Sequence, residues 1–316
     1  MKKYVIRRLI LVIPTVFLAG TLVFFMLRVL PGDIVTMLTS EGGATEATKE
    51  KLREELGLND PMIVQYARWL GDMATGNLGY SHYQDRYVTQ IVVDKLEATL
   101  TLAIFALTFS LSLGFTLGVI SAINRGNWLD QGIRIFTGLS LAIPPFWMGI
   151  MLIIIMSTTF NWARPIIYTS FFSDPWTSIL QLFLPVFALS MDLAAVQSRL
   201  VRSMMLEVLR EDYVRTARAK GLREFVVITR HTIRNAAIPV ITMAGYHFGA
   251  VLSGVVVIEN VFSIPGLGEQ VLQSIFARDY TMVVGIVVAI TTILAVWILI
   301  VDLFYAVVDP RIRYSD

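Results

Sequence analysis

Residues 282–301 read MVVGIVVAITTILAVWILIV, a run of twenty residues without a charge. A helix needs about 20 apolar residues to cross the roughly 30 Å hydrocarbon core of a bilayer. The whole chain has the same character: 55% of its residues are hydrophobic, 16% are charged, and the mean hydropathy is +0.66. A soluble domain typically carries about 25% charged residues. The composition therefore predicts a membrane protein, and it excludes both a soluble domain and a disordered chain.

Five more uncharged stretches predict an all-α, polytopic protein with six transmembrane helices. The first follows four basic residues, and its length without a small-x-small cleavage site favours an uncleaved helix over a signal peptide. Pro144-Pro145 is expected to kink the third, either as part of a gate or as a static bend. The expected spans are residues 9–27, two stretches between Glu97 and Arg125 and between Arg134 and Arg164, and then residues 179–198, 236–258 and 282–301.

The distribution of Lys and Arg predicts the orientation of these spans. Of the 26 basic residues, 17 fall on the side that holds both termini, which is therefore expected to be cytoplasmic. The opposite side holds residues 33–94, with ten acids against five bases.

Three domains are expected along the chain: a tail with the first transmembrane helix (1–30), an extracytoplasmic cap (31–95) and a core (96–316). The cap contains helix-compatible stretches at 44–56 and 61–73, and glycines break them at positions 57, 76 and 79. A loop of this length usually carries its own structure. A small folded cap is therefore predicted, with a partly ordered insertion as the alternative.

The cytoplasmic segment 199–237 differs in character from the spans. Its apolar residues predict two short amphipathic helices bent at Gly221. Four acids are interleaved with nine bases, which favours a protein partner over a basic helix lying on lipid headgroups. The first helix is expected to present Leu206, Leu209, Tyr213 and Ala217 on one face, and the second Leu222, Phe225, Val226 and Thr229.

The sequence YVRTARAKGL at 213–222, followed by HTIRNA at 231–236 and by Pro239, resembles the EAA loop of ABC-importer permeases of the dipeptide, oligopeptide and nickel class. Arg215 stands where that motif has Glu, whereas Gly221 is in register. Matching segments run along essentially the whole chain: RRL at 7–9, LPGD at 30–33, GNLG at 76–79, FSIPGLG at 262–268, VDL at 301–303 and DPRIR at 309–313.

This resemblance implies a transmembrane permease subunit of an ATP-driven importer in a bacterial cytoplasmic (inner) membrane. The implied partners are a homologous second permease, two ABC ATPase subunits, an extracytoplasmic solute-binding protein and membrane lipid. The chain itself is expected to be no enzyme and to hold no cofactor, because ATP and Mg²⁺ bind to the partner ATPases. It contains no G-x-x-x-x-G-K-[ST] motif. Its net charge of +2 is too small to suggest nucleic acid.

The resemblance leaves the solute open. Di- or oligopeptides or a similar small polar solute are expected, with nickel chelates, glutathione, opines and oligosaccharides as alternatives within the same class. It further implies that the glycine-bent loop, here called the coupling loop (199–237), inserts into a cleft of the ATPase. The expected coupling residues are Arg215, Ala217, Arg218, Lys220, Gly221, Leu222, Arg223, Phe225, Arg234 and Asn235.

Ionisable residues at membrane depth are costly and suggest function. Asp192 is expected either to contact a polar or cationic solute or to be a structural carboxylate. Glu259 either lines an outer gate or rests in headgroup water. Gly245 and Gly249 share the GxxxG spacing of Gly114 and Gly118, which favours close helix packing. The candidate translocation path is Asp192, Gly245, Gly249 and Glu259.

Other classes of function have little support in the sequence. An ion-coupled secondary transporter usually shows more intramembrane carboxylates and internal repeats. An intramembrane enzyme would need a nucleophile or metal cluster, and the chain has no cysteine, no H-E-x-x-H and no G-x-S-x-G. His247 is interpreted as a hydrogen-bonded core residue, too isolated from His82 and His231 to bind a metal. Asp302 is expected to pair structurally with an arginine.

Overall fold

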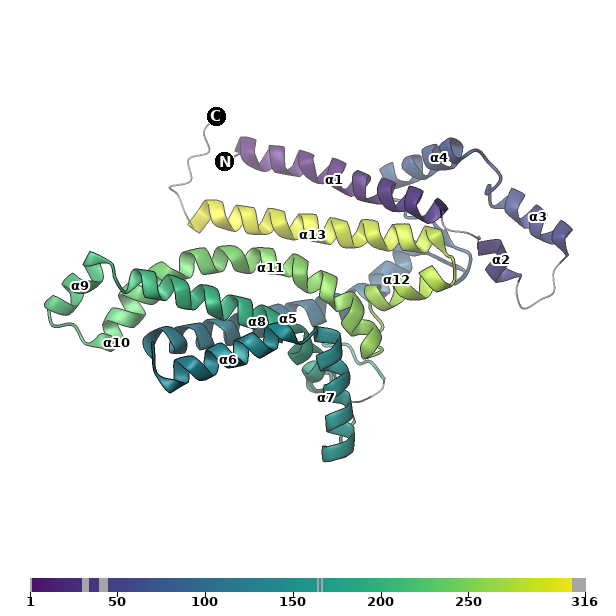
Figure 1. Cartoon of the computed structure of the whole chain (residues 1–316). Coiled ribbons are helices and arrows are strands. Elements are labelled where there is room, and N and C mark those ends of the chain that lie inside the picture. The colour runs from purple at the N-terminus through teal and green to yellow at the C-terminus, as the bar shows by residue number, and fades with distance from the viewer. Residues whose placement is uncertain (1, 30–33, 40–44, 164, 166, 309–316) are drawn as a thin grey trace. The chain divides into compact units, whose positions relative to one another are not determined.

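The computed structural model describes residues 2–29, 34–39, 45–163, 165 and 167–308, and within them the regular secondary structure is helical apart from one short hairpin (Figure 1). The LPGD and DPRIR segments and Arg164 lie outside the described residues. The chain divides into two compact units, one of Met1–Glu97 with Pro265–Asp316 and one of Ala98–Ile264.

The first unit contains both ends of the chain. Its long helices α1 (Lys2–Val29) and α13 (Tyr280–Val308) lie side by side (Figure 1). Shorter elements join them: α2 (Ile34–Leu38), α3 (Glu46–Glu55), α4 (Met62–Ala74), the antiparallel pair β1 (Tyr80–Ser81) and β2 (Arg86–Tyr87), the start of α5 (Val88–Ile123), and α12 (Leu267–Phe276).

Helices α3 and α4 occupy the two stretches that the sequence predicted to be helical in the loop after α1. Gly57, Gly76 and Gly79 break them with φ of +65°, +79° and +95°. An aromatic cluster holds α4 against α1, because Phe24 and Trp69 have ring centroids 5.4 Å apart. The contact is close at Gly20, where an added Cβ would lie 2.9 Å from the Trp69 ring.

The second unit is built around α8 (Pro175–Val208), half of whose residues are buried. It packs against α6 (Trp128–Ala142), α7 (Pro145–Phe160) and α11 (Arg234–Val261). Gly114 and Gly118 of α5 also face it, since a Cβ at Gly118 would lie 2.5 Å from Val201 Cβ. This close approach supports the packing interpretation of that GxxxG pair.

Within the described residues, four helices are long and apolar enough to cross a membrane: α1, α5, α8 and α13. Helices α6 and α7 make a fifth candidate if they form one span, and they are bent by 102° at Pro144-Pro145. The predicted kink is therefore confirmed. Residues Gly245–Val261 of α11 form a shorter apolar helix. The fold is all-α and polytopic, while the count of six spans stays a prediction.

Candidate coupling site and solute pathway

The coupling loop (199–237) begins within the last three turns of α8, which ends at Val208. Leu209 caps that helix, the chain extends at Glu211, and α9 (Asp212–Ala219) then starts in a new direction. The prediction of one continuous apolar face from Leu206 to Ala217 is therefore wrong, because the break falls inside it. The periodicity gave no sign of this break, since apolar residues happen to recur at helical steps on both sides of it.

The predicted bend at Gly221 is confirmed, and its geometry explains the glycine. The N–H of Gly221 donates to Arg218 O at 2.9 Å and that of Leu222 to Ala217 O at 3.3 Å. These two bonds form a Schellman motif, which ends a helix with a residue in the left-handed conformation. Gly221 has φ of +78°, and nothing lies within 4 Å of the position that a Cβ would take.

After the bend the chain returns through α10 (Glu224–Val226) and the π-helix η1 (Val227–Ile233) into α11. A small apolar cluster joins the two arms of the loop, formed by Val214, Ala217 and Val227 with Val208 packed against them. Asn235 Nδ2 also donates to Tyr213 Oη at 3.0 Å across the loop. The sequence prediction included Ala217 but missed Val214 and Val227, although both are β-branched apolar residues in a strongly charged segment.

The outer surface of the bend combines exposed apolar side chains with charges. Leu222 and Phe225 are 41% and 75% exposed. Arg218 forms a bidentate pair with Glu224, with Nη2 2.6 Å from Oε1, and this guanidinium holds the pKa of Glu224 below its usual value. Arg218 is thus already paired within the loop. The predicted coupling residues Arg215, Lys220, Arg223 and Arg234 are exposed, as is Asn235.

A groove of about 500 Å³ lies between the end of α8 and the start of α9. It carries charges of both signs, with the α9–α10 segment forming one end of its unit (Figure 1). The lining residues are Arg199, Arg202, Ser203, Leu206, Glu207, Arg210, Glu211 and Asp212.

Asp192 of α8 and His247 of α11 lie on two helices that pack against each other. Asp192 Oδ1 accepts from Leu193 N at 2.7 Å, and no Lys or Arg of the described chain lies within salt-bridge distance of it. His247 is 8% exposed, and its Nδ1 has no hydrogen-bond partner among the described residues.

The other candidate path residues have different settings. Gly245 and Gly249 lie on α11 and are partly exposed. Glu259 is fully buried and accepts a 2.7 Å hydrogen bond from Thr99 Oγ1. The interpretation that Glu259 rests in headgroup water is therefore wrong, because its carboxylate is shielded within the second unit.

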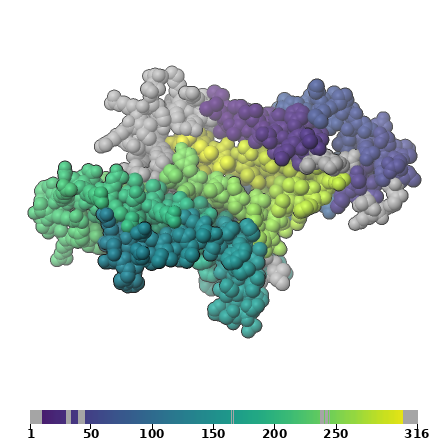
Figure 2. Space-filling view, in the orientation of Figure 1, coloured from purple at the N-terminus to yellow at the C-terminus, as the bar shows by residue number. Residues whose placement is uncertain are grey.

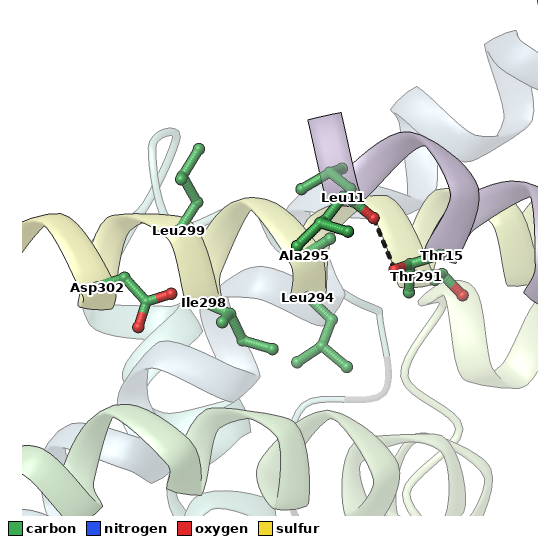
Figure 3. A pocket seen from close by; sticks show the side chains of 9 residues that line it. Leu11, Thr15, Thr291, Leu294, Ala295, Ile298, Leu299 and Asp302 are labelled. Carbon is green, nitrogen blue, oxygen red and sulfur yellow. Dashed lines mark hydrogen bonds between the residues drawn. The ribbon is translucent and has the colours of Figure 1, made fainter. Parts of the chain in front are cut away.

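Asp302 of α13 is also buried, and it lies at one end of a cavity of about 190 Å³ between α1 and α13 (Figure 3). The remaining lining is apolar apart from two threonines, and Thr15 Oγ1 donates to Leu11 O at 2.8 Å. Among the described residues no group of three or more His, Cys, Asp or Glu is placed to hold a metal ion.

Residues 114–314 match the family described as the binding-protein-dependent transport system inner membrane component, and residues 1–103 match its N-terminal companion. The chain belongs to this family. It is therefore a multi-pass inner-membrane permease subunit of an ABC importer, a class in which separate ATPase subunits hydrolyse ATP.

Relatives match this permease over its whole length. It is 37% identical to the oligopeptide transport system permease protein AppB of Bacillus subtilis, with 99% of this chain and 100% of that protein covered. It is 35% identical to the dipeptide transport system permease protein DppB of Alkalihalophilus pseudofirmus, with the same coverage.

A solved structure shares the fold of the permease. The crystal structure of an amino acid ABC transporter with histidines matches with a TM-score of 0.53 and 16% identity, covering 69% of this chain and 94% of that one.

Proposed function

We propose that this permease imports di- or oligopeptides, or a similar small polar solute, through a pathway formed with a homologous second permease. The names of its relatives AppB and DppB support peptides. Nickel chelates, glutathione, opines or oligosaccharides are the alternative cargoes of the same class.

The proposed assembly includes two ATPases in the cytoplasm and a solute-binding protein outside. The permease contributes six transmembrane helices, with residues 31–95 as an outer cap and both termini in the cytoplasm. The excess of acids in that cap and the basic residues of the coupling loop support this orientation. ATP binding closes the ATPases and moves the coupling loop, which opens the path outward.

The coupling loop carries this proposal because it is built as a self-supporting projection. Val214 and Val227 give it a core, the Schellman turn at Gly221 makes a narrow tip, and Leu222 and Phe225 present apolar side chains beside it. Exposed apolar anchors within a charged rim are the usual composition of a protein interface. Arg215, Lys220 and Arg223 would set the register and the rate of association.

The solute pathway is proposed to run past Asp192, Gly245 and Gly249. No Lys or Arg of the described chain lies within 4 Å of the Asp192 carboxylate. The Nδ1 atom of His247 has no hydrogen-bond partner among the described residues. Water, the second permease or the cargo's ammonium group can satisfy them. Glu259 supports the path from behind, because its bond to Thr99 ties α11 to α5.

Affinity purification of the tagged chain in mild detergent tests the assembly. A second permease and ATPases are expected to co-purify with it. Purification of the chain alone, under conditions where an established ABC importer stays intact, would contradict the proposal. Uptake of labelled dipeptides by cells expressing the complete assembly, compared with cells carrying Asp192→Asn, then tests the cargo and the path.

A further inference from the structure

A cavity of about 390 Å³ between α6 and α8 has a strongly basic lining. Arginines supply half of the residues around it, and acidic side chains supply none. The lining consists of Gln131, Arg134, Ile135, Thr137, Arg199 and Arg202.

Arg202 is held in place by a buried carboxylate. Its Nε and Nη2 each lie 2.9 Å from an oxygen of Asp130, which is 2% exposed. Asp130 also accepts from Ser121 Oγ at 2.5 Å and from Gly126 N at 3.0 Å. This network fixes one wall of the cavity, and it neutralises the charge of Arg202.

The charges of the other two arginines are not neutralised by an acidic side chain of the described chain. Neither Arg134 nor Arg199 has an acidic partner within 4 Å among the residues that the structure describes, and both are exposed. Arg199 lies three residues before Arg202, so the two share one face of α8. The cavity therefore presents two uncompensated guanidinium groups beside a rigid wall.

An apolar strip continues from this cavity along α6. Trp128, Ile135 and Leu139 follow one another at helical steps, and they are 79%, 58% and 59% exposed. Helix α6 lies at the surface of its unit, drawn in blue-green in Figure 2. A tryptophan at the end of such a strip is typical of the membrane–water interface.

We propose that this cavity binds the phosphate group of an anionic phospholipid of the cytoplasmic leaflet, with Arg134 and Arg199 on the phosphate and the α6 strip along an acyl chain. Arginine binds phosphate oxygens bidentately, and basic pockets between membrane helices on the cytoplasmic side suit anionic headgroups. The site rests on the proposed orientation of the permease. A partner protein is the weaker choice of occupant, because the cavity lacks the mixed charges of the neighbouring groove.

The test counts lipids bound to the purified, delipidated transporter complex by native mass spectrometry. Wild-type protein is expected to bind added phosphatidylglycerol but not added phosphatidylcholine. Arg134→Gln and Arg199→Gln should each weaken binding about fivefold, and the double variant about 25-fold. A basic residue near an anionic lipid surface contributes about fivefold to the binding constant. Arg134→Lys with Arg199→Lys should restore part of the loss. Arg125→Gln is the matched control, since Arg125 is exposed in the adjoining turn but outside the lining.

Three results would overturn the proposal. The double Gln variant could bind phosphatidylglycerol as wild type does. Inorganic phosphate at millimolar concentration could displace the lipid, which would make the cavity a site for free anions. Loss of the ATPases from the double variant with lipid binding unchanged would assign the arginines to a partner protein. Failure of wild-type protein to co-purify with ATPases would instead refute the proposed assembly, and lipid binding would still be measurable.

Discussion

Substitutions of Gly221 distinguish a loop tip that docks in an ATPase from a turn that only shapes the coupling loop. With φ of +78°, Gly221 sits in a conformation that costs an ordinary L-residue roughly 1–2 kcal/mol. No atom lies within 4 Å of the added Cβ, so this conformational cost is the whole cost within the chain. Gly221→Ala should therefore weaken any function of the turn by about fivefold to 30-fold. Aspartate adopts this conformation more readily than alanine, so Gly221→Asp disturbs the free turn less.

Docking in an ATPase cleft makes Gly221→Asp more damaging than Gly221→Ala. An aspartate at the tip would then place an uncompensated charge in a closed interface, which costs about 3–5 kcal/mol, or more than about 100-fold in affinity. We expect Gly221→Asp to lose the ATPases on affinity purification, whereas Gly221→Ala keeps a reduced amount. The assay is quantitative co-purification of ATPase with tagged permease, normalised to the recovered permease.

Gly76, in the proposed outer cap, offers a matched control. It also ends a helix in a Schellman motif, with φ of +79° and no atom within 4 Å of an added Cβ. Gly76→Asp should keep its ATPases. Docking of the loop tip in the ATPase is refuted if Gly221→Asp retains as much ATPase as Gly221→Ala, or if Gly76→Asp loses as much ATPase as Gly221→Asp.

Three further perturbations follow from the packing. Val227→Ala removes buried methyl groups from the core of the coupling loop and should destabilise the loop by about 1–3 kcal/mol. Proteolysis of the loop should become faster, while the melting temperature of the protein in detergent stays nearly unchanged. Proteolysis at the wild-type rate would contradict this. Gly118→Leu should prevent the contact of α5 with α8 and lower the yield of folded protein in size-exclusion chromatography, whereas Gly132→Leu, at an open position, should not. The Asp279 carboxylate caps α13 by accepting from Met282 N, and it also accepts from Ser81 Oγ. Burial raises the pKa of this carboxyl, so its ionisation lowers the free energy of unfolding once the pH rises above about 4. Asp279→Asn keeps the cap, and its melting temperature relative to wild type should increase with pH from that point; a constant difference would refute the assignment.

Local features of this fold could be predicted from the sequence because their causes are local. Gly57, Gly76 and Gly221 end helices since they adopt φ that other residues avoid. Pro144-Pro145 bends the chain because proline cannot continue a helix. The close approach of Gly118 to α8 follows from the absence of a side chain.

Pairing between distant residues could not be predicted in this way. Asp130 and Arg202 are 72 residues apart, and only the packing of α6 against α8 brings them together. The packing of α11, which carries His247, against α8, which carries Asp192, is likewise a contact between segments far apart in the sequence. Periodicity indicates which face of a helix is apolar, but it does not specify the helix against which that face packs. For the same reason the sequence did not reveal that Glu259 is buried.

The central claim is that the tip of the coupling loop contacts an ATPase in the cytoplasm. The chain has no cysteine, so Phe225→Cys introduces one unique thiol at a side chain that is 75% exposed. Cross-linking of this thiol in membranes should capture the ATPase, and the yield should change when ATP is added. Tyr83→Cys, at an exposed residue of the cap, should capture no ATPase and should react with impermeant maleimide from outside. Labelling of Phe225→Cys from outside, or capture of the ATPase by Tyr83→Cys alone, would contradict the account.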